Sequence, residues 1–205
     1  MSITKVTFRV NIGGEEKILT EAKLGPYASF LGLDRIAPGR YSWAFVADLY
    51  LNEHLQGVDP TMVIEELKDM EAGRSTTGTK PASEFTRPPL KGLWHKHYFS
   101  AHFVPTNILN HLSGDKMMKL AEHVFDRTVS PVCTEEMLRQ FAHEISHGSL
   151  EQRTSANKLT GEWIVFAKHV GQNYYLRTTT HNHGDQALYD SIRSTSLREF
   201  PFLQL

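Results

Sequence analysis

The sequence predicts a single α+β domain in which several helices combine with an antiparallel hairpin near each end of the chain. Three observations support this fold class. Polar and apolar residues alternate over residues 3–11 and again from 163 to 180, which is the period of a strand. Between these segments, apolar residues recur at helical spacing behind capping residues. A length of 205 residues suits one substantial core, so we expect one domain over residues 1–205.

Composition excludes several classes of protein. With 22 Lys and Arg against 23 Asp and Glu, the chain has no overall field to attract nucleic acid or anionic lipid. Any such binding therefore requires a local patch. The single Cys133 forms no internal disulfide, and no signal peptide or apolar stretch of about 18–20 residues is present. We expect a cytoplasmic protein with no membrane partner.

The first segments indicate a hairpin followed by irregular chain. The alternation over residues 3–11 predicts a strand, and Gly13-Gly14 predicts a turn into a second short strand around residues 17–19. Gly25-Pro26 and Pro38-Gly39 both contain strong helix breakers. They predict an irregular stretch between the hairpin and the first helix.

Two helices and a long loop are expected next. Ser42 should cap a helix over residues 43–55, because a serine hydroxyl accepts a backbone N–H of the first turn. Asp59-Pro60 opens a second helix, which Gly73 ends. Glycine, proline, serine and threonine then fill residues 73–92, which predicts a long flexible loop.

The middle of the chain is expected to be mostly helical. Residues 94–104 are aromatic and fit either a strand or a helix, and residues 105–112 predict a short helix. Asp115 should cap a helix to about Arg127, and Thr134 should cap another to about His147. The first of these two helices is expected to bury a stripe of Met117, Met118, Leu120, Ala121, Val124 and Phe125.

The clearest strand signal lies near the C-terminus. Residues 163–169 alternate in polarity, Gly171-Gln172-Asn173 forms a turn, and residues 174–180 form the return strand. Asp185 is expected to cap a closing helix to about Arg193. The apolar tail at residues 200–203 should dock on the core.

The most specific chemical motif is the HExxH pattern of residues 143–147, in a chain with 11 histidines. Residues four apart lie on one face of a helix, so His143 and His147 can bind one zinc ion. Glu144 can then polarise a zinc-bound water as a general base. We expect the buried face of this helix to consist of Met137, Leu138, Phe141 and Ile145. Both histidines then point away from the core.

Residues 141–148 resemble the active helix of zincin metallopeptidases. The resemblance implies a peptidase-like, zinc-dependent hydrolase that acts on a peptide or small-molecule substrate. It assigns zinc binding to His143 and His147 and the role of catalytic base to Glu144.

The third zinc ligand is not part of this motif. Metzincins continue with a glycine and a third histidine, where this chain has Leu150 and Arg153. Two histidines follow the C-terminal hairpin directly. His181 and His183 are therefore the candidates for the remaining ligand.

The C-terminal hairpin supports an alternative function. Metal-independent ribonucleases need a base, an acid and a cation around the phosphate. The hairpin and its exit carry Lys168, His169, Tyr174, Tyr175, Arg177, His181 and His183. A small α+β protein that ends in such a hairpin is loosely similar to toxin-type ribonucleases, which implies nucleic-acid contacts by Lys168, His169, Tyr175 and Arg177.

A third interpretation is a non-enzymatic binding or interaction protein. Residues 74–103 interleave cations with aromatic rings, among them Lys91, Trp94 and Lys96. Cations bind phosphates and aromatic faces stack on bases, so this strip is a candidate nucleic-acid surface. The acidic residues 48–71 could instead neutralise it across the fold, and His95 and His97 could be metal ligands on one strand face.

Overall fold

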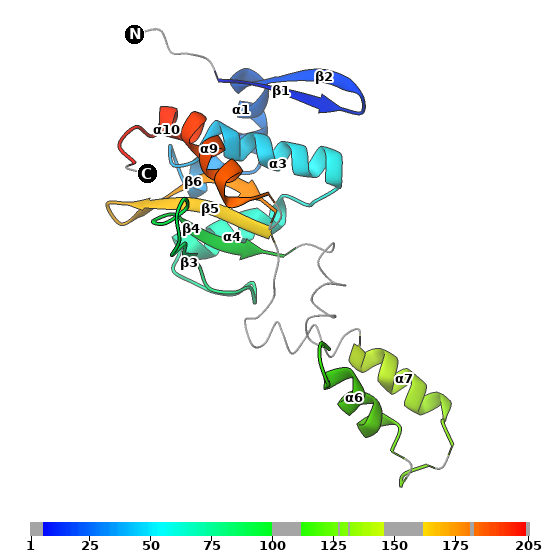
Figure 1. Cartoon of the computed structure of the whole chain (residues 1–205). Helices are drawn as coiled ribbons and strands as arrows, with labels where there is room; N and C mark the ends of the chain where they lie inside the picture. Colours follow the sequence, from blue (N-terminus) through cyan, green and yellow to red (C-terminus); the bar gives the residue numbers. More distant parts are fainter. Residues whose placement is uncertain are drawn as a thin grey trace, which may run out of the picture.

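A computed structural model describes residues 6–99, 112–126, 128–130, 132–145, 162–180 and 183–203 of the chain (Figure 1). The described strands are β1 (Thr7–Ile12), β2 (Glu15–Thr20), β3 (Ser83–Glu84), β4 (Trp94–Tyr98), β5 (Glu162–His169) and β6 (Gln172–Thr179). The described helices are α1 (Glu21–Phe30), α2 (Leu33–Ile36), α3 (Trp43–Gln56), α4 (Thr61–Glu71), α6 (Lys116–Val124), α7 (Glu135–His143), α9 (Asp185–Ser194) and α10 (Ser196–Glu199). The predicted α+β class, with an antiparallel hairpin near each end, is confirmed.

The N-terminal hairpin forms as predicted, but the chain after it is helical. β1 and β2 pair antiparallel around Gly13-Gly14, whose positive φ angles of 65° and 87° suit glycine. The expected irregular stretch at Gly25-Pro26 is wrong, because α1 runs through both residues. Leu24 and Ala28 lie one turn apart in α1 and are buried, and α1 packs against α3. Tertiary packing therefore overrides the local helix breakers.

Helix α3 begins where its capping residue predicts, whereas α4 begins one residue later than expected, at Thr61 with Pro60 in the cap position. The Ser42 hydroxyl accepts the Phe45 backbone N–H at 3.1 Å, and Asp59 accepts the Thr61 backbone N–H at 2.9 Å. The α3 helix ends at Gly57, which has a left-handed backbone conformation.

The long segment after α4 is irregular except for β3. Within residues 73–92, Thr79 and Leu90 are fully buried, so the segment is anchored to the body of the protein at two points. The ambiguous aromatic segment begins as a strand, since residues 94–98 form β4. The rest of that segment, from residue 100, and most of the helix predicted over 105–112 lie outside the described residues.

The larger sheet has the strand order β3-β4-β5-β6, with every neighbouring pair antiparallel. The predicted C-terminal hairpin is its β5–β6 pair, with the turn at Val170-Gly171. β5 is buried on both faces. Ile164 and Phe166 join a core with α1, α3 and α4, while Val165 and Ala167 join a second core with α9 and the C-terminal tail. Phe200 and Leu203 of that tail are buried, as predicted.

Helices α6 and α7 lie side by side (Figure 1), joined by a contact between the Phe125 and Phe141 rings at 5.0 Å. The predicted cap of α7 is confirmed, because the Thr134 hydroxyl accepts the Met137 backbone N–H at 3.2 Å. Asp115 precedes α6 without a side-chain cap, and Asp185 is the first residue of α9, behind Gly184.

The predicted buried faces of α6 and α7 need correction. The Met118 side chain is 63% exposed, Met117 is also exposed, and Val124 is the buried residue of α6. Leu138 of α7 is exposed as well. The half-buried rings of Phe125 and Phe141 face each other between the two helices. Among the described residues, no helix has the length and apolarity needed to cross a bilayer.

Candidate functional site

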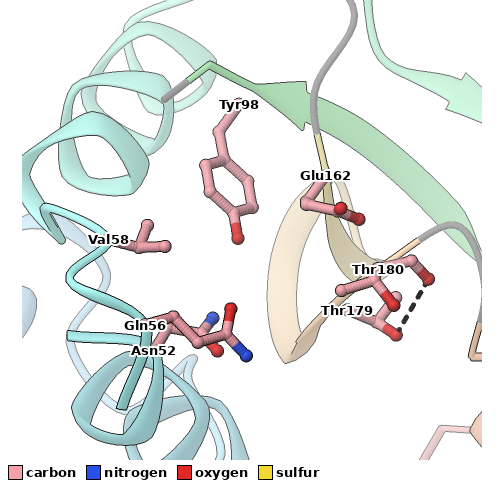
Figure 2. A pocket seen from close by; sticks show the side chains of 7 residues that line it. All are labelled: Asn52, Gln56, Val58, Tyr98, Glu162, Thr179 and Thr180. Atoms are coloured by element: carbon pink, nitrogen blue, oxygen red, sulfur yellow. Dashed lines mark hydrogen bonds between the residues drawn. The ribbon is translucent and has the colours of Figure 1, made fainter. Parts of the chain in front are cut away.

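A cavity of about 210 Å³ lies at one end of the larger sheet. Neighbouring antiparallel strands bring the end of β4, the start of β5 and the end of β6 to the same edge, so Tyr98 pairs with Glu162 and Trp163 with Thr179. The C-terminal part of α3 closes the other side. The residues that line this cavity, hereafter the Tyr98 cavity, are Asn52, Gln56, Val58, Tyr98, Glu162, Thr179 and Thr180 (Figure 2).

The α3 wall of the cavity is built from polar residues four apart in sequence. Asp48, Asn52 and Gln56 therefore lie on one face of the helix. Asp48 accepts two hydrogen bonds from the Arg177 guanidinium, at 2.6 and 2.8 Å, and Asn52 donates to the Thr178 hydroxyl at 3.1 Å. These bonds hold α3 against β6 and leave Gln56 at the cavity.

The ion pair beneath the cavity is shielded from water. Burial raises the pKa of Asp48, and the neighbouring Arg177 charge opposes that rise. His183, just beyond β6, also acts on Asp48 electrostatically and lowers its pKa. His183 is the first histidine after β6 among the described residues. It therefore lies close enough to Asp48 on α3 to interact with it electrostatically.

Tyr98 is the most distinctive group in the cavity. Its side chain is 2% exposed, and Figure 2 shows its hydroxyl directed toward the space between α3 and β6. The hydroxyl makes no hydrogen bond to any residue that the structure describes. Burial, reinforced by the charges of Glu162 and Asp48, raises the pKa of Tyr98 far above its usual range. The phenol therefore remains protonated at neutral pH and can donate to a ligand.

The lining favours a particular ligand chemistry. It offers two carboxamides, two threonine hydroxyls, a phenol and one carboxylate, and among its described residues it has no cationic side chain. Glu162, which lies across from Tyr98 in Figure 2, disfavours an anion. The volume of the Tyr98 cavity is below the roughly 300–1,000 Å³ of sites for drug-sized molecules. A ligand with a single ring is therefore the size that the cavity can hold.

The structure describes part of the predicted zinc site. His143 is exposed in the last turn of α7, and Glu144 follows it. His147 and His181 lie outside the described residues. Over the described ranges, no group of three His, Cys, Asp or Glu side chains could hold a metal ion, so His143, Glu144 and His183 are not brought together.

The two histidines of β4 lie among aromatic rings. His95 and His97 both contact Trp163, with ring centroids 5.0 and 6.3 Å apart, and His95 also contacts Phe85. His97 is buried. In the described part of the chain these side chains pack on the second core and form no cluster suited to a metal.

Two of the hairpin residues in the ribonuclease hypothesis are engaged inside the fold. Tyr175 is fully buried and donates to Glu71 at 2.7 Å, and Arg177 is paired with Asp48. Lys168 and His169 lie nearer the surface at the hairpin turn, where the Lys168 ammonium is 3.5 Å from the centroid of the Trp94 ring.

The candidate nucleic-acid strip likewise contains both buried and exposed cations. Lys96 is 5% exposed, lies 3.2 Å from Glu66 and donates to the Lys80 carbonyl at 2.8 Å. Lys91 is exposed. Lys96 of the strip thus pairs with Glu66 of the acidic segment. Arg74 of the strip lies 3.5 Å from Asp69 of the same segment.

Sequence reasoning did not single out the residues of the Tyr98 cavity. One local signal was present, since Asp48, Asn52 and Gln56 recur every four residues and form a polar row on one face of the helix. The meeting of Tyr98 with Glu162 has no local signal, because residues 99–161 separate them. No protein-family model, curated protein or solved structure matches the chain.

Proposed function

We propose that the chain binds a small polar molecule, uncharged or cationic, in the Tyr98 cavity. The observation that carries this proposal is the hydroxyl of the buried Tyr98, which faces the cavity and bonds to no described residue. A ligand in the cavity that accepts a hydrogen bond from this hydroxyl would gain about 0.5–1.5 kcal/mol from it.

The expected ligand class follows from the donors and acceptors around the cavity. Carboxamides of Asn52 and Gln56 can each donate and accept, and the Glu162 carboxylate accepts when ionised. A single ring that bears several hydroxyl or amino groups, such as a monosaccharide or a nucleobase, matches this pattern. A ligand of this kind would also fill the volume without bringing a negative charge near Glu162.

The test is isothermal titration calorimetry with a panel of monosaccharides and nucleosides. We expect saturable binding of at least one probe, weakened at least tenfold by Tyr98→Phe and by Glu162→Gln. Tyr189→Phe on α9, a partly exposed tyrosine away from the cavity, is the matched control and should bind like the wild type. If no probe binds saturably, or if Tyr98→Phe binds like the wild type, the proposal is wrong.

A second candidate, a zinc-dependent hydrolase of the peptidase type, rests on different residues. The HExxH motif begins in the last turn of α7, and an exposed His143 is accessible to a metal ion. In this candidate His143 and His147 bind zinc, His181 or His183 completes the site, and Glu144 activates the water.

Elemental analysis of the purified protein tests this second candidate. We expect about one zinc per chain, loss of zinc in His143→Ala, and zinc retained but cleavage of a fluorogenic peptide library lost in Glu144→Gln. His123→Ala, which removes an exposed histidine of α6, is the control and should keep its zinc. Absence of stoichiometric metal from the wild type rules the hydrolase out and leaves the Tyr98 cavity unaffected.

A further inference from the structure

A second cavity, of about 230 Å³, lies at the opposite end of β5 and β6. It is formed where the chain after α4 meets the β5–β6 turn. Its polar rim includes Arg74, Ser75, Lys168 and Asn173, and Pro81 and Ala82 contribute an apolar wall. This cavity, hereafter the Lys168 groove, shares no lining residue with the Tyr98 cavity.

The acidic residues nearest to the groove are already engaged. Glu66 is paired with Lys96, and Asp69 accepts the Thr76 hydroxyl at 2.8 Å. Glu71 is bonded to Arg40 and to Tyr175. Of the two exposed rim cations, only Arg74 forms an ion pair with an acid of α4, through Asp69.

Two cations at the groove are available to a ligand. Lys168 is exposed, and within the described ranges it has no carboxylate partner; its ammonium rests over the Trp94 ring. The Arg74 side chain is 60% exposed, and its Nε lies 3.5 Å from Asp69. Its two terminal nitrogens bond to no described residue.

We propose that the Lys168 groove binds the phosphate group of a nucleotide. The Arg74 fork can donate two parallel hydrogen bonds to phosphate oxygens, while Lys168 supplies a point charge. The Ser75 hydroxyl, exposed and bonded to no described residue, lies beside them as a further donor. The apolar wall at Pro81 and Ala82 suits the flat face of a base.

This inference goes beyond the proposed function, because the ligand is an anion and the cavity is a different one. The same phosphate chemistry could come from a free mononucleotide or from a nucleotide within a single-stranded RNA. We favour the free mononucleotide, because the groove is small and the two available cations are adjacent rather than spread along a track.

The test is calorimetric titration with AMP, adenosine and a six-nucleotide oligoadenylate RNA at two salt concentrations. We expect AMP to bind saturably and adenosine to bind at least tenfold more weakly. Lys168→Gln and Arg74→Gln should each weaken AMP binding at least tenfold, and both side chains are exposed, so the variants should fold. Lys119→Gln, on the exposed side of α6, is the charge-matched control.

Each outcome of the titration bears on the proposal. Equal affinity for AMP and the RNA, per nucleotide bound, supports a free nucleotide as the ligand. RNA binding at least a hundredfold tighter, with a steeper salt dependence, overturns that choice in favour of a nucleic-acid strand. No saturable AMP binding, or AMP affinity unchanged in both groove variants, overturns the proposal altogether.

Discussion

Both carboxylate oxygens of Glu199 accept the backbone N–H of Trp43, at 3.2 and 3.0 Å, so the last turn of α10 caps the start of α3. This N–H belongs to the first residue of α3 and has no acceptor within the helix. Burial raises the pKa of Glu199 to about 7, although the bond to Trp43 opposes the rise.

The raised pKa of Glu199 makes the stability depend on pH. Between about pH 4.5 and 7, the folded state holds a proton on Glu199 that the unfolded state has lost. The contribution of Glu199 to the free energy of unfolding is therefore complete below about pH 4.5 and falls as the pH rises through about 7. Glu199→Gln should flatten this part of the profile in urea unfolding experiments.

The control for this prediction is Glu122→Gln, which removes an exposed carboxylate of α6. It should keep the slope of the wild type between pH 4.5 and 7. An unchanged slope in Glu199→Gln would contradict the assignment of that slope to the buried carboxyl group.

The pairing of Lys96 with Glu66 predicts a strong mutational effect. Both side chains are buried, so Lys96→Met leaves the Glu66 carboxylate without its cation. Loss of one partner of a buried ion pair costs about 3–5 kcal/mol of unfolding free energy. The double variant Lys96→Met, Glu66→Leu should recover most of that loss. Urea unfolding measures both, and a single variant within about 1 kcal/mol of the wild type would exclude a buried charge at Glu66.

The cap at Ser42 is expected to matter more than an ordinary surface cap. Its hydroxyl accepts from Phe45 and donates to the Leu176 carbonyl at 2.7 Å, which ties α3 to β6. Ser42→Ala should lower the free energy of unfolding by about 2 kcal/mol or more, because a cap and a buried bond are lost together. Thr134→Ala, at the half-buried α7 cap, should cost about 1 kcal/mol or less, because only the cap is lost. Thermal unfolding measures both variants.

Two buried tyrosines form a matched pair for a further test. The Tyr175 hydroxyl donates to Glu71, whereas the Tyr98 hydroxyl bonds to no described residue. Tyr175→Phe should lower the free energy of unfolding by about 1–3 kcal/mol, and Tyr98→Phe should leave it within about 1 kcal/mol. Urea unfolding measures both variants. Equal losses of unfolding free energy would show that the Tyr98 hydroxyl also has a hydrogen-bond partner inside the folded protein.

Several features encoded by neighbouring residues were predictable from the sequence, although the expected caps at Asp115 and Asp185 were not observed. Ser42 and Thr134 cap their helices as expected, and Gly13-Gly14 turns the first hairpin. Each depends on bonds or backbone angles within a few residues. The α1 helix was missed for the opposite reason, since distant contacts of Leu24 and Ala28 stabilise it against Pro26.

The candidate sites also differ in whether neighbouring or distant residues form them. HExxH is a local pattern and can be read directly, whereas both cavities are made by residues that meet only after the sheet has formed. The burial of Lys96 and Arg177 likewise depends on acids in α4 and α3 that sequence spacing does not bring next to them. Charge patterns in the sequence therefore overstated the cations available at the surface.

The interval between β4 and β5 has a consequence for the order of folding. β5 and β6 are joined by a two-residue turn, and such a hairpin forms within about 1–10 μs. β4 can join them only when residues 99–161 close a long loop. The entropy of closure grows slowly with loop length, so this interval slows assembly far more than it lowers final stability. A chain in which a short linker replaces residues 99–161 should therefore assemble its sheet faster and retain nearly the same strand pairing.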